Sequence, residues 1–369
     1  MIKVEPLEGD PYRLMPQFPN LPKAEHNYAW ELASRNKRGL ALDLKSPAGR
    51  EVLNTLVARA DVFITNYPLP VRARLGIGYE AMAALNPKLV YASLSGYGEE
   101  GAEAERPGFD AHAYWARSGL ADVVRPDPDG PPATLSLGMG DQPSAAMLYG
   151  AIVTALYQRE RTGQGAWVQS SLIGNGAWAN APAIQAVLCG GEVPYRLPRH
   201  AARNALTCFY RCREGRWFMI TLLNEDKQWP LFTQVLDAPA LAADERFATQ
   251  AARRANAPAL VQVLDAVFGQ RDSAEWQQRF QSAGLTASVV ARTADALDDA
   301  QMRAAGVLVP AAAVPHTGLT VDSPFRIAGQ EKVVPRPAPA IGEHTDAVLR
   351  EHGFAPERIA ELRAQKIVG

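Results

Sequence analysis

Cysteine is scarce in this chain, with three in 369 residues, and an odd number cannot all pair. The N-terminus has neither the charged nor the apolar region of a signal peptide, so reduced thiols and a cytoplasmic location are expected. Cys208 and Cys212 do not have the spacing of a zinc knuckle, and the six histidines are scattered. No metal site is therefore expected.

Neither sign of charge predominates, because 38 basic residues face 39 acidic ones and the net charge is −1. This balance argues against nucleic acid or an anionic membrane as a partner. No apolar run approaches the length of a membrane span. The chain is 47% hydrophobic and long enough for two domains, so it can bury a sizeable core.

Short apolar runs alternate with amphipathic segments in the first part of the chain. Strands are expected at residues 39–43, 61–65 and 88–94, and helices over 49–60 and 79–85. This alternation predicts βαβ units, an α/β fold with a parallel sheet, and ligands bound beyond the carboxyl ends of the strands.

Two loops directly follow expected strands. The first contains Asn66 and Tyr67, and the second, residues 95–98, contains Gly96 and Tyr97. Both are candidate ligand loops in a parallel sheet, although ordinary turns explain the spacing equally well.

The organisation of the chain predicts two domains. Residues 1–205 are expected to form a larger α/β domain, and residues 206–327 a smaller α+β domain with a hairpin around Gly215. The stretch 177–206 is punctuated by Ala, Pro and Gly and is expected to connect them. Residues 328–369 would return to the larger domain.

Asp141 directly precedes an amphipathic run, residues 145–160, whose apolar positions recur at helical spacing. Unpaired N–H groups and the positive end of the helix dipole would keep its carboxylate ionised. Gly138 and Gly140 would let another molecule approach closely. These are the properties of a carboxylate nucleophile. The alternative is that Asp141 or Ser144 is simply the N-cap of the helix.

Short blocks along nearly the whole chain resemble, in their order and spacing, the family III CoA-transferases, which include formyl-CoA and carnitine CoA-transferases. Each block is weak by itself, whereas the series is a strong signal. The blocks are residues 2–5, 36–50, 60–67, 74–80, 86–89, 93–98, 106–110, 160–165 and 341–345, followed by two terminal helices.

The resemblance implies a Rossmann-like large domain that uses CoA and acyl-CoA as substrates, with no permanently bound cofactor. It places Asp141 at the position of the family's nucleophile. The implied mechanism passes through an aspartyl anhydride and an aspartyl–CoA thioester, with backbone N–H groups rather than a metal stabilising the oxyanions. Small carboxylic acids as further substrates and an interlocked homodimer are also implied.

The resemblance also implies a set of CoA contacts, for which Lys45 and Arg74 would supply the cations that meet phosphates. The alternative for these two is that they are solvated surface charges. We add Gly96 and Tyr97 of the second loop, and Phe109. The cofactor-binding candidates are therefore Leu42, Lys45, Asn66, Tyr67, Arg74, Leu75, Gly96, Tyr97 and Phe109.

Asp110 matches a family position close to the nucleophile and is the second catalytic candidate. It is expected to position substrate or to stay protonated beside Asp141, because two carboxylates in one pocket rarely both ionise. A capping aspartate is the alternative.

Phe109 separates this chain from the α-methylacyl-CoA racemases, which share the fold but have an acid/base histidine at that position. A phenyl ring cannot move a proton, and His112 lies three residues out of register. A racemase or epimerase remains the alternative function. Residues 114–119 resemble members that act on larger, often 2-hydroxy or aryl, acids, although core packing explains Tyr114 and Trp115 equally well.

Two departures from the family are visible. Family members begin with a strand, a Gly-containing turn and a helix before the block that here is residues 2–5, so an unpaired place in the sheet and a missing wall of the active site are expected. A truncated, non-catalytic CoA-binding homologue is therefore a further alternative. Residues 222–226 contain no glycine, so a gating loop different from the family's Gly-rich one is expected.

Overall fold

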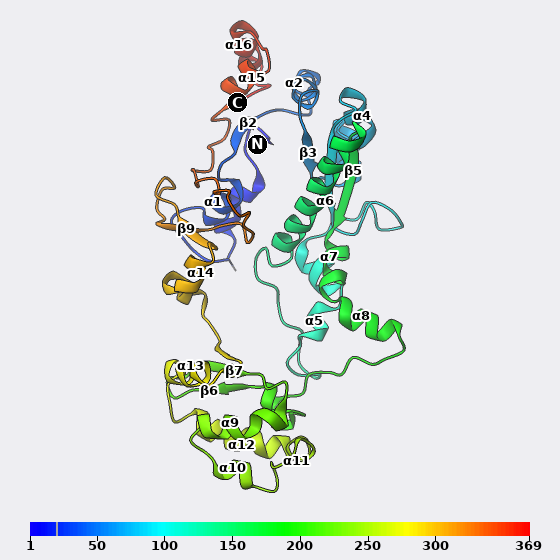
Figure 1. Ribbon diagram of the computed structural model, residues 1–369. Coiled ribbons are helices and arrows are strands. Elements are labelled where there is room, and N and C mark those ends of the chain that lie inside the picture. Colours follow the sequence, from blue (N-terminus) through cyan, green and yellow to red (C-terminus); the bar gives the residue numbers. More distant parts are fainter. Residues whose placement is uncertain (20) are drawn as a thin grey trace. The chain divides into compact units, whose positions relative to one another are not determined.

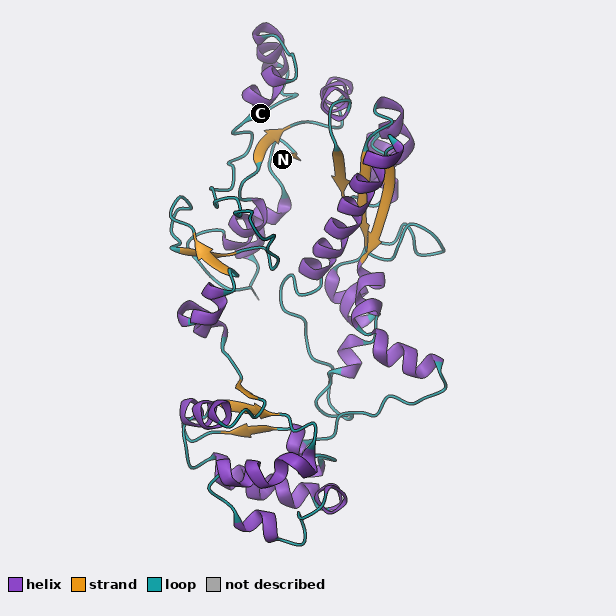
Figure 2. Ribbon diagram, viewed as in Figure 1, coloured by secondary structure: helices purple, strands orange, loops and turns teal. Residues whose placement is uncertain are grey.

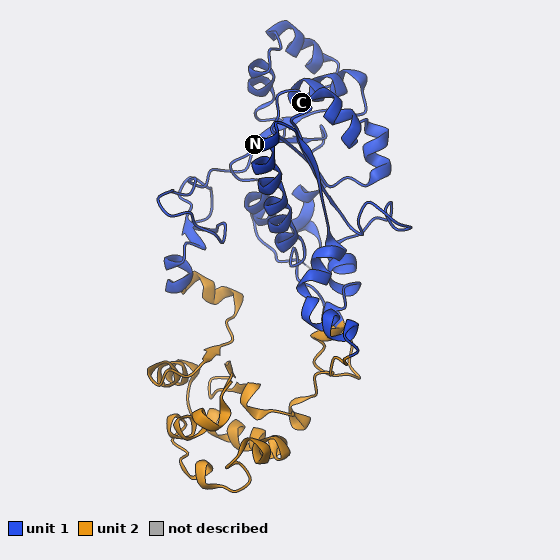
Figure 3. Cartoon of the chain, turned by 45° about the vertical axis from the view of Figure 1, so that its right-hand side comes forward, with its two compact units in different colours: residues 1–121, 134–190, 300–369 blue, residues 122–133, 191–299 orange. Residues whose placement is uncertain are grey.

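The computed structural model describes residues 1–19 and 21–369. The chain divides into two compact units (Figure 3). Unit 1 comprises residues 1–121, 134–190 and 300–369, and unit 2 comprises residues 122–133 and 191–299. The chain thus passes between compact units after residues 121, 133, 190 and 299, whereas the sequence places its domain boundaries at 205 and 327. Those boundaries stay a prediction.

The N-terminal part of unit 1 contains a two-stranded parallel sheet, β1 (Ile2–Glu5) and β2 (Arg38–Ala41). Between them lie a 3-10 helix, η1 (Pro11–Gln17), and α1 (Tyr28–Ser34). Each begins at a side-chain cap, since Asp10 accepts from the N–H of Tyr12 and Asn27 accepts from that of Trp30. Glu5 is buried and accepts two hydrogen bonds from Arg13, which ties η1 to β1.

A second parallel sheet has the order β3 (Val62–Thr65), β4 (Val90–Ser95) and β5 (Ala166–Ser171). Helix α2 (Pro47–Val57) leads into β3, α3 (Leu69–Leu75) and α4 (Tyr79–Leu85) lie between β3 and β4, and α6 (Asp141–Thr162) lies between β4 and β5 (Figure 1). The two faces of β4 differ: Val90 and Ala92 pack against Leu148 and Ile152 of α6, whereas Tyr91 belongs to the core on the other face. The alternation of α-helices and parallel strands confirms the predicted α/β fold of this unit (Figure 2).

The parallel strands of unit 1 form two sheets rather than one. Among the described residues, β1 pairs with a strand only on the side of β2, and β3 only on the side of β4. The sequence predicts one sheet with an unpaired place. The described strands instead form two sheets, whose edge strands are β1 and β2 in one and β3 and β5 in the other.

Unit 2 is built on an antiparallel sheet of β6 (Phe209–Arg211), β7 (Trp217–Ile220) and β8 (Ala287–Val289). Gly215, with φ of +84°, makes the turn between β6 and β7, where the hairpin is predicted. Aromatic side chains dominate its core, including Phe218, Phe268 and Phe280. The helices that cover it are α9 (Glu225–Val235), α10 (Ala240–Ala243), α11 (Gln250–Ala255), α12 (Ala257–Phe268) and α13 (Ser273–Ser282).

The remaining elements are short. A π-helix, η2 (Ala111–Ala116), follows the loop after β4, and α7 (Leu172–Ala179) packs against it. Among the described residues, no helix combines the length and the apolar character that crossing a membrane requires. The other elements are α5 (Leu120–Val123), α8 (Ala181–Leu188), η3 (Arg199–Ala201), η4 (Ala205–Thr207), η5 (Thr293–Asp298), α14 (Ala300–Ala304), β9 (Leu308–Pro310), β10 (Leu319–Val321), α15 (Thr345–Glu351) and α16 (Pro356–Ala364).

Candidate functional site

Asp141 is the first residue of α6, and the N-cap is Gly140, which has no side chain with which to cap the helix. The interpretation of Asp141 as an N-cap is therefore wrong. Ser144 does not cap the helix from outside either, because its buried hydroxyl donates to the carbonyl oxygen of Gly140 at 2.7 Å. The Asp141 carboxylate is exposed, and no residue of the described chain forms a hydrogen bond or ion pair with it. It is therefore free to meet a substrate.

The first turn of α6 has fewer free N–H groups than the sequence predicts. The N–H of Gln142 donates to the carbonyl oxygen of Gly138 at 2.9 Å, and that of Ser144 donates to Gly140 at 3.3 Å. The N–H of Asp141 has no backbone acceptor among the residues described here. It is the group in this turn that remains available to an oxyanion.

Asp110 lies directly against the segment that carries Asp141. Its Oδ1 accepts from the N–H of Ala111 at 2.8 Å, and its Oδ2 accepts from the N–H of Gly140 at 3.3 Å. The carboxylate thus joins the start of η2 to the start of α6. A single π-helical turn such as η2 often accompanies a functional site.

Glycine is required at position 140 because neighbouring side chains leave no room for a Cβ atom. The φ angle of Gly140 is not the reason, since other residues can adopt it. A Cβ atom at this position would lie 2.8 Å from the Cβ of Asp110 and 2.8 Å from the Cγ of Tyr114. Both contacts are shorter than van der Waals separation, so a side chain here would push α6 away from Asp110. The glycine therefore sets the distance between the two carboxylates.

The pKa of Asp141 is raised to about 6, first because the surrounding protein displaces water from the carboxyl group and second because Asp110 carries the same charge. Asp141 is still mostly ionised at neutral pH, as the sequence predicts, but its pKa is raised rather than kept low by the helix dipole. The raised pKa belongs to the proposed nucleophile. The oxygens of Asp110, which is predicted to position substrate or to stay protonated, accept from two backbone N–H groups.

Tyr12 of η1 borders the same site, and the sequence gives no sign of it. Burial raises the pKa of its phenol, and among the charges that add to this effect the largest is that of Asp141. The N-terminal segment of unit 1 therefore faces the two carboxylates. No local pattern links Tyr12 to Asp141, because the two are far apart in the chain.

The second predicted ligand loop adjoins Asp110. A Cβ on Gly96 would lie 3.0 Å from the Cα of Gly108, and a Cβ on Gly108 would lie 2.8 Å from the ring of Tyr97. The loop after β4 therefore packs closely against the segment that leads to Asp110. Phe109, the last residue of that segment before Asp110, is 74% exposed.

The other predicted CoA residues surround the ends of β2 and β3 but differ in exposure. Asn66 and Tyr67 are exposed in the loop after β3, and Lys45 and Arg74 are exposed cations with no ion pair to any described residue. The side chains that are not exposed are those of Leu42 and Leu75, which pack in the hydrophobic core. A direct side-chain contact of these two leucines with CoA would require that core to open.

The sequence also misses Arg72, which lies in α3 and is buried. Its Nε donates to the carbonyl oxygen of Tyr67 at 2.5 Å, and its Nη1 donates to Glu99 at 2.7 Å. The ion pair therefore connects the loop after β3 to the loop after β4. In the sequence Arg72 resembles any charge of a basic helix, and only its burial reveals this role.

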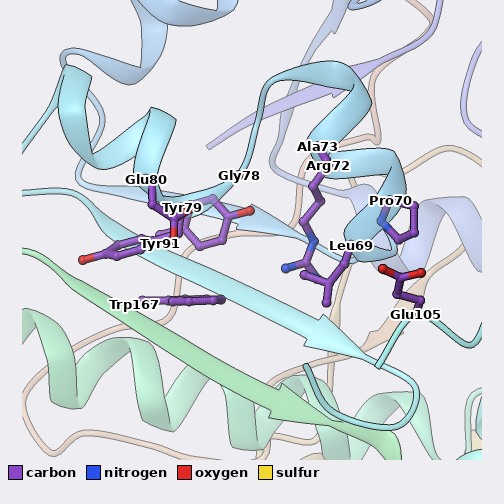
Figure 4. Close-up of a pocket in the computed structure, with 10 residues that line it drawn as sticks. All are labelled: Leu69, Pro70, Arg72, Ala73, Gly78, Tyr79, Glu80, Tyr91, Glu105 and Trp167. Atoms are coloured by element: carbon purple, nitrogen blue, oxygen red, sulfur yellow. The ribbon is translucent and has the colours of Figure 1, made fainter. Parts of the chain in front are cut away.

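A cavity of about 330 Å³ lies on the Tyr91 face of β4 and β5. Figure 4 shows the rings of Tyr79, Tyr91 and Trp167 grouped at one end of it, with Arg72 projecting from α3. None of the predicted site residues lines it. The candidate site is therefore the Asp110–Asp141 junction rather than this cavity.

Two further interpretations concern the surroundings of the site. Tyr114 is buried with Ala113 and Leu172, so core packing accounts for it.

Among the described residues no group of three or more His, Cys, Asp or Glu side chains is placed to hold a metal ion. The site therefore consists of two carboxylates, a free backbone N–H group and exposed apolar side chains.

Known proteins are similar to this chain both in sequence and in fold. The model of the family described as CoA-transferase family III matches residues 1–345. The (R)-2-hydroxy-4-methylpentanoate CoA-transferase of Clostridioides difficile is 30% identical, covering 100% of this chain and 92% of that protein. The cinnamoyl-CoA:phenyllactate CoA-transferase of Clostridium sporogenes is 28% identical over 99% and 90%. A CAIB/BAIF family protein from Brucella suis is similar in structure, with a TM-score of 0.83, 29% identity, and coverage of 95% and 91%.

Proposed function

Because the chain belongs to CoA-transferase family III and is a CoA-transferase, we propose that Asp141 is the residue on which CoA is carried between acids. Membership of the family, together with the similarity to known CoA-transferases, supports the transfer of CoA from an acyl-CoA to a carboxylic acid. The covalent route through Asp141 is the part that we add. A cytoplasmic location, predicted from the scarce and unpaired cysteines, belongs to the same proposal.

The route begins when a carboxylate oxygen of Asp141 attacks the thioester carbonyl carbon of the donor. The C–S bond breaks, CoA leaves as a thiolate, and a mixed anhydride forms. The thiolate then attacks the aspartyl carbonyl carbon, which releases the donor acid as a carboxylate and leaves CoA on Asp141 as a thioester. No proton has to be transferred in either step.

The second half reverses these steps with a different acid. The acceptor carboxylate attacks the aspartyl thioester carbonyl, expels the CoA thiolate and forms a second anhydride. The thiolate attacks the acceptor's acyl carbon, giving the new acyl-CoA and restoring the Asp141 carboxylate. The free N–H of Asp141 is the group placed to stabilise oxyanions on its own side chain.

One observation carries the proposal: Asp141 is an exposed, unpartnered carboxylate whose pKa, raised to about 6, keeps it ionised at neutral pH. A carboxylate with a raised pKa is more nucleophilic than one stabilised by an ion pair, yet it still carries the charge that attack requires. The racemase alternative has less support, because Phe109, the residue before Asp110, has no proton to exchange.

The test is CoA exchange between acetyl-CoA, butyryl-CoA or succinyl-CoA and a panel of acids. We expect Asp141→Ala to lower turnover by at least about a thousandfold. The matched control, Asp298→Ala, changes another exposed aspartate and should retain full activity. Intact-mass measurement should find CoA bound to the wild-type chain through the Asp141 carboxyl group, and hydroxylamine should release it.

Three outcomes would contradict the mechanism or the activity. Full turnover in Asp141→Ala would remove Asp141 from the mechanism. Solvent deuterium at C2 of the acyl group without any exchange of acids would indicate a racemase. CoA binding without exchange would indicate a non-catalytic homologue.

We also propose that the chain forms a homodimer. Helix α6 exposes Met147, Tyr149 and Tyr157 outside its buried stripe, and the next two helices expose Trp178 and Leu188. Exposed apolar side chains that gather on neighbouring helices are often covered by a partner in soluble proteins. Light scattering of the purified chain should give twice the mass of one chain, and a monomer would contradict the proposal.

A further inference from the structure

Three exposed apolar side chains flank the two carboxylates. Phe109 precedes Asp110 and is 74% exposed, whereas Leu137 and Met139 lie shortly before Asp141 and are 39% and 54% exposed. The hydrogen bond from the N–H of Gly140 to Asp110 joins the two segments that carry these side chains. The junction therefore presents two negative charges next to uncovered hydrophobic surface.

Within the described part of the chain neither Asp110 nor Asp141 forms an ion pair with a Lys, Arg or His side chain. Only burial and the charge of Asp110 account for the raised pKa of Asp141, with no basic group opposing them. The two arginines nearest in sequence to Asp110 are Arg106 and Arg117, and both are paired with Glu103. They are therefore engaged with another carboxylate.

From these two features we propose that the site selects acids with one carboxylate and an apolar remainder over dicarboxylic acids. The inference rests on the proposed function, since it names the acids that Asp141 would exchange. A second carboxylate on the substrate would meet Asp110 and Asp141 without a counter-ion, and like charges at short range oppose binding. An apolar remainder would instead cover Phe109 and Met139 and remove their surface from water.

The test is an internal competition, in which equal concentrations of 3-phenylpropanoate and glutarate compete for CoA from one donor. The ratio of the two acyl-CoA products equals the ratio of their kcat/KM values, whatever fraction of the enzyme is active. We expect 3-phenylpropanoyl-CoA to exceed glutaryl-CoA by at least about tenfold, the discrimination that a mismatched group in a pocket typically gives. Acetyl-CoA, butyryl-CoA and succinyl-CoA serve as alternative donors.

A charge introduced at the site should change this ratio. In Met139→Arg the guanidinium would supply the missing counter-ion, and we expect the ratio to shift towards glutarate by about tenfold or more. Met139→Leu, which keeps the apolar surface, should leave the ratio unchanged. Val333→Arg introduces the same charge at an exposed apolar residue outside the site and should also leave it unchanged.

The outcomes separate the two proposals. Preference of the wild-type enzyme for glutarate, with exchange dependent on Asp141, would overturn this inference and leave the proposed function standing. A shift of equal size in Val333→Arg would show that the effect of Met139→Arg is not local, and would also overturn it. No exchange with any donor and any acid would overturn the proposed function, and with it the inference.

Discussion

The Asp141 carboxyl group combines two properties that usually oppose each other, accessibility and a raised pKa. Its pKa of about 6 arises from lost hydration and from Asp110. In the proposed mechanism the attacking form is the ionised one, so protonation below this pKa would remove the nucleophile. The pH dependence of transfer therefore reports the environment of this one side chain.

We expect kcat/KM for the acyl-CoA donor to fall below about pH 6, by about tenfold for each further pH unit. In Asp110→Asn the like charge is gone, so the pKa of Asp141 should decrease and the acidic limb should move to lower pH. Initial rates measured between pH 4.5 and 8 test this. An acidic limb that stays in place or moves to higher pH in Asp110→Asn would contradict the assignment.

At the scale of single residues, the sequence predicts the two carboxylates of the candidate site. It does not predict the residues that tertiary packing brings next to that site. Asp141 and Asp110 are both predicted, and the structure places Asp110 against Gly140. Tyr12 and Arg72 are not predicted, because a residue acquires such a role from the tertiary fold. The burial of Leu42 and Leu75 is the usual state of leucine, and it is the family resemblance that suggests their contact with CoA.

At the scale of elements, α6 and η2 are held together by a contact that has no room for a side chain. Gly140→Ala would place a methyl group 2.8 Å from Asp110 and Tyr114, so the two elements must separate. We expect a loss of about 1–3 kcal/mol in the free energy of unfolding, measured in urea. Transfer activity should fall as well, because the distance between the carboxylates changes.

Gly150 supplies the matched control in the same helix. A Cβ atom there meets nothing within 4 Å, and alanine is a better helix former than glycine. Gly150→Ala should therefore raise the free energy of unfolding by roughly 0.5–1 kcal/mol. Equal destabilisation by both substitutions would show that the α6–η2 contact does not depend on the missing side chain.

The sequence predicts the long elements better than the short ones. The helical periodicity after Asp141 and the buried strand at β4 are both found. The stretch 177–206 is predicted as a connection, but α8 occupies Ala181–Leu188, because proline fits within the first turn of a helix and does not break it there. The π-helix η2 has no recognisable sequence pattern at all.

At the scale of the whole molecule, each compact unit has its own hydrophobic core. Phe280 of unit 2 is fully buried, with ring neighbours that include Phe218 and Phe232. Phe280→Ala should cost about 3–5 kcal/mol. Phe209→Ala, in an exposed position of the same unit, should cost less than about 1 kcal/mol.

Hydrogen exchange of the full chain, resolved by segment, tests whether this cost is confined to unit 2. We expect Phe280→Ala to lower protection in β6 and β7 and to leave β4 and β5 unchanged. An equal loss in all four strands would show that the two units unfold as one. The α/β pattern of the first unit is evident in the sequence, whereas its division into two sheets depends on long-range pairing that no local pattern encodes.

The open edge of β3 also affects how the protein behaves when concentrated. Among the described residues no strand pairs with its outer side, from Val62 to Thr65, and Ile64 of this strand is an exposed apolar side chain. Backbone groups in this state promote aggregation, since a strand from a neighbouring molecule can satisfy them regardless of its sequence. Storage at low concentration and short purification times should therefore preserve more soluble enzyme.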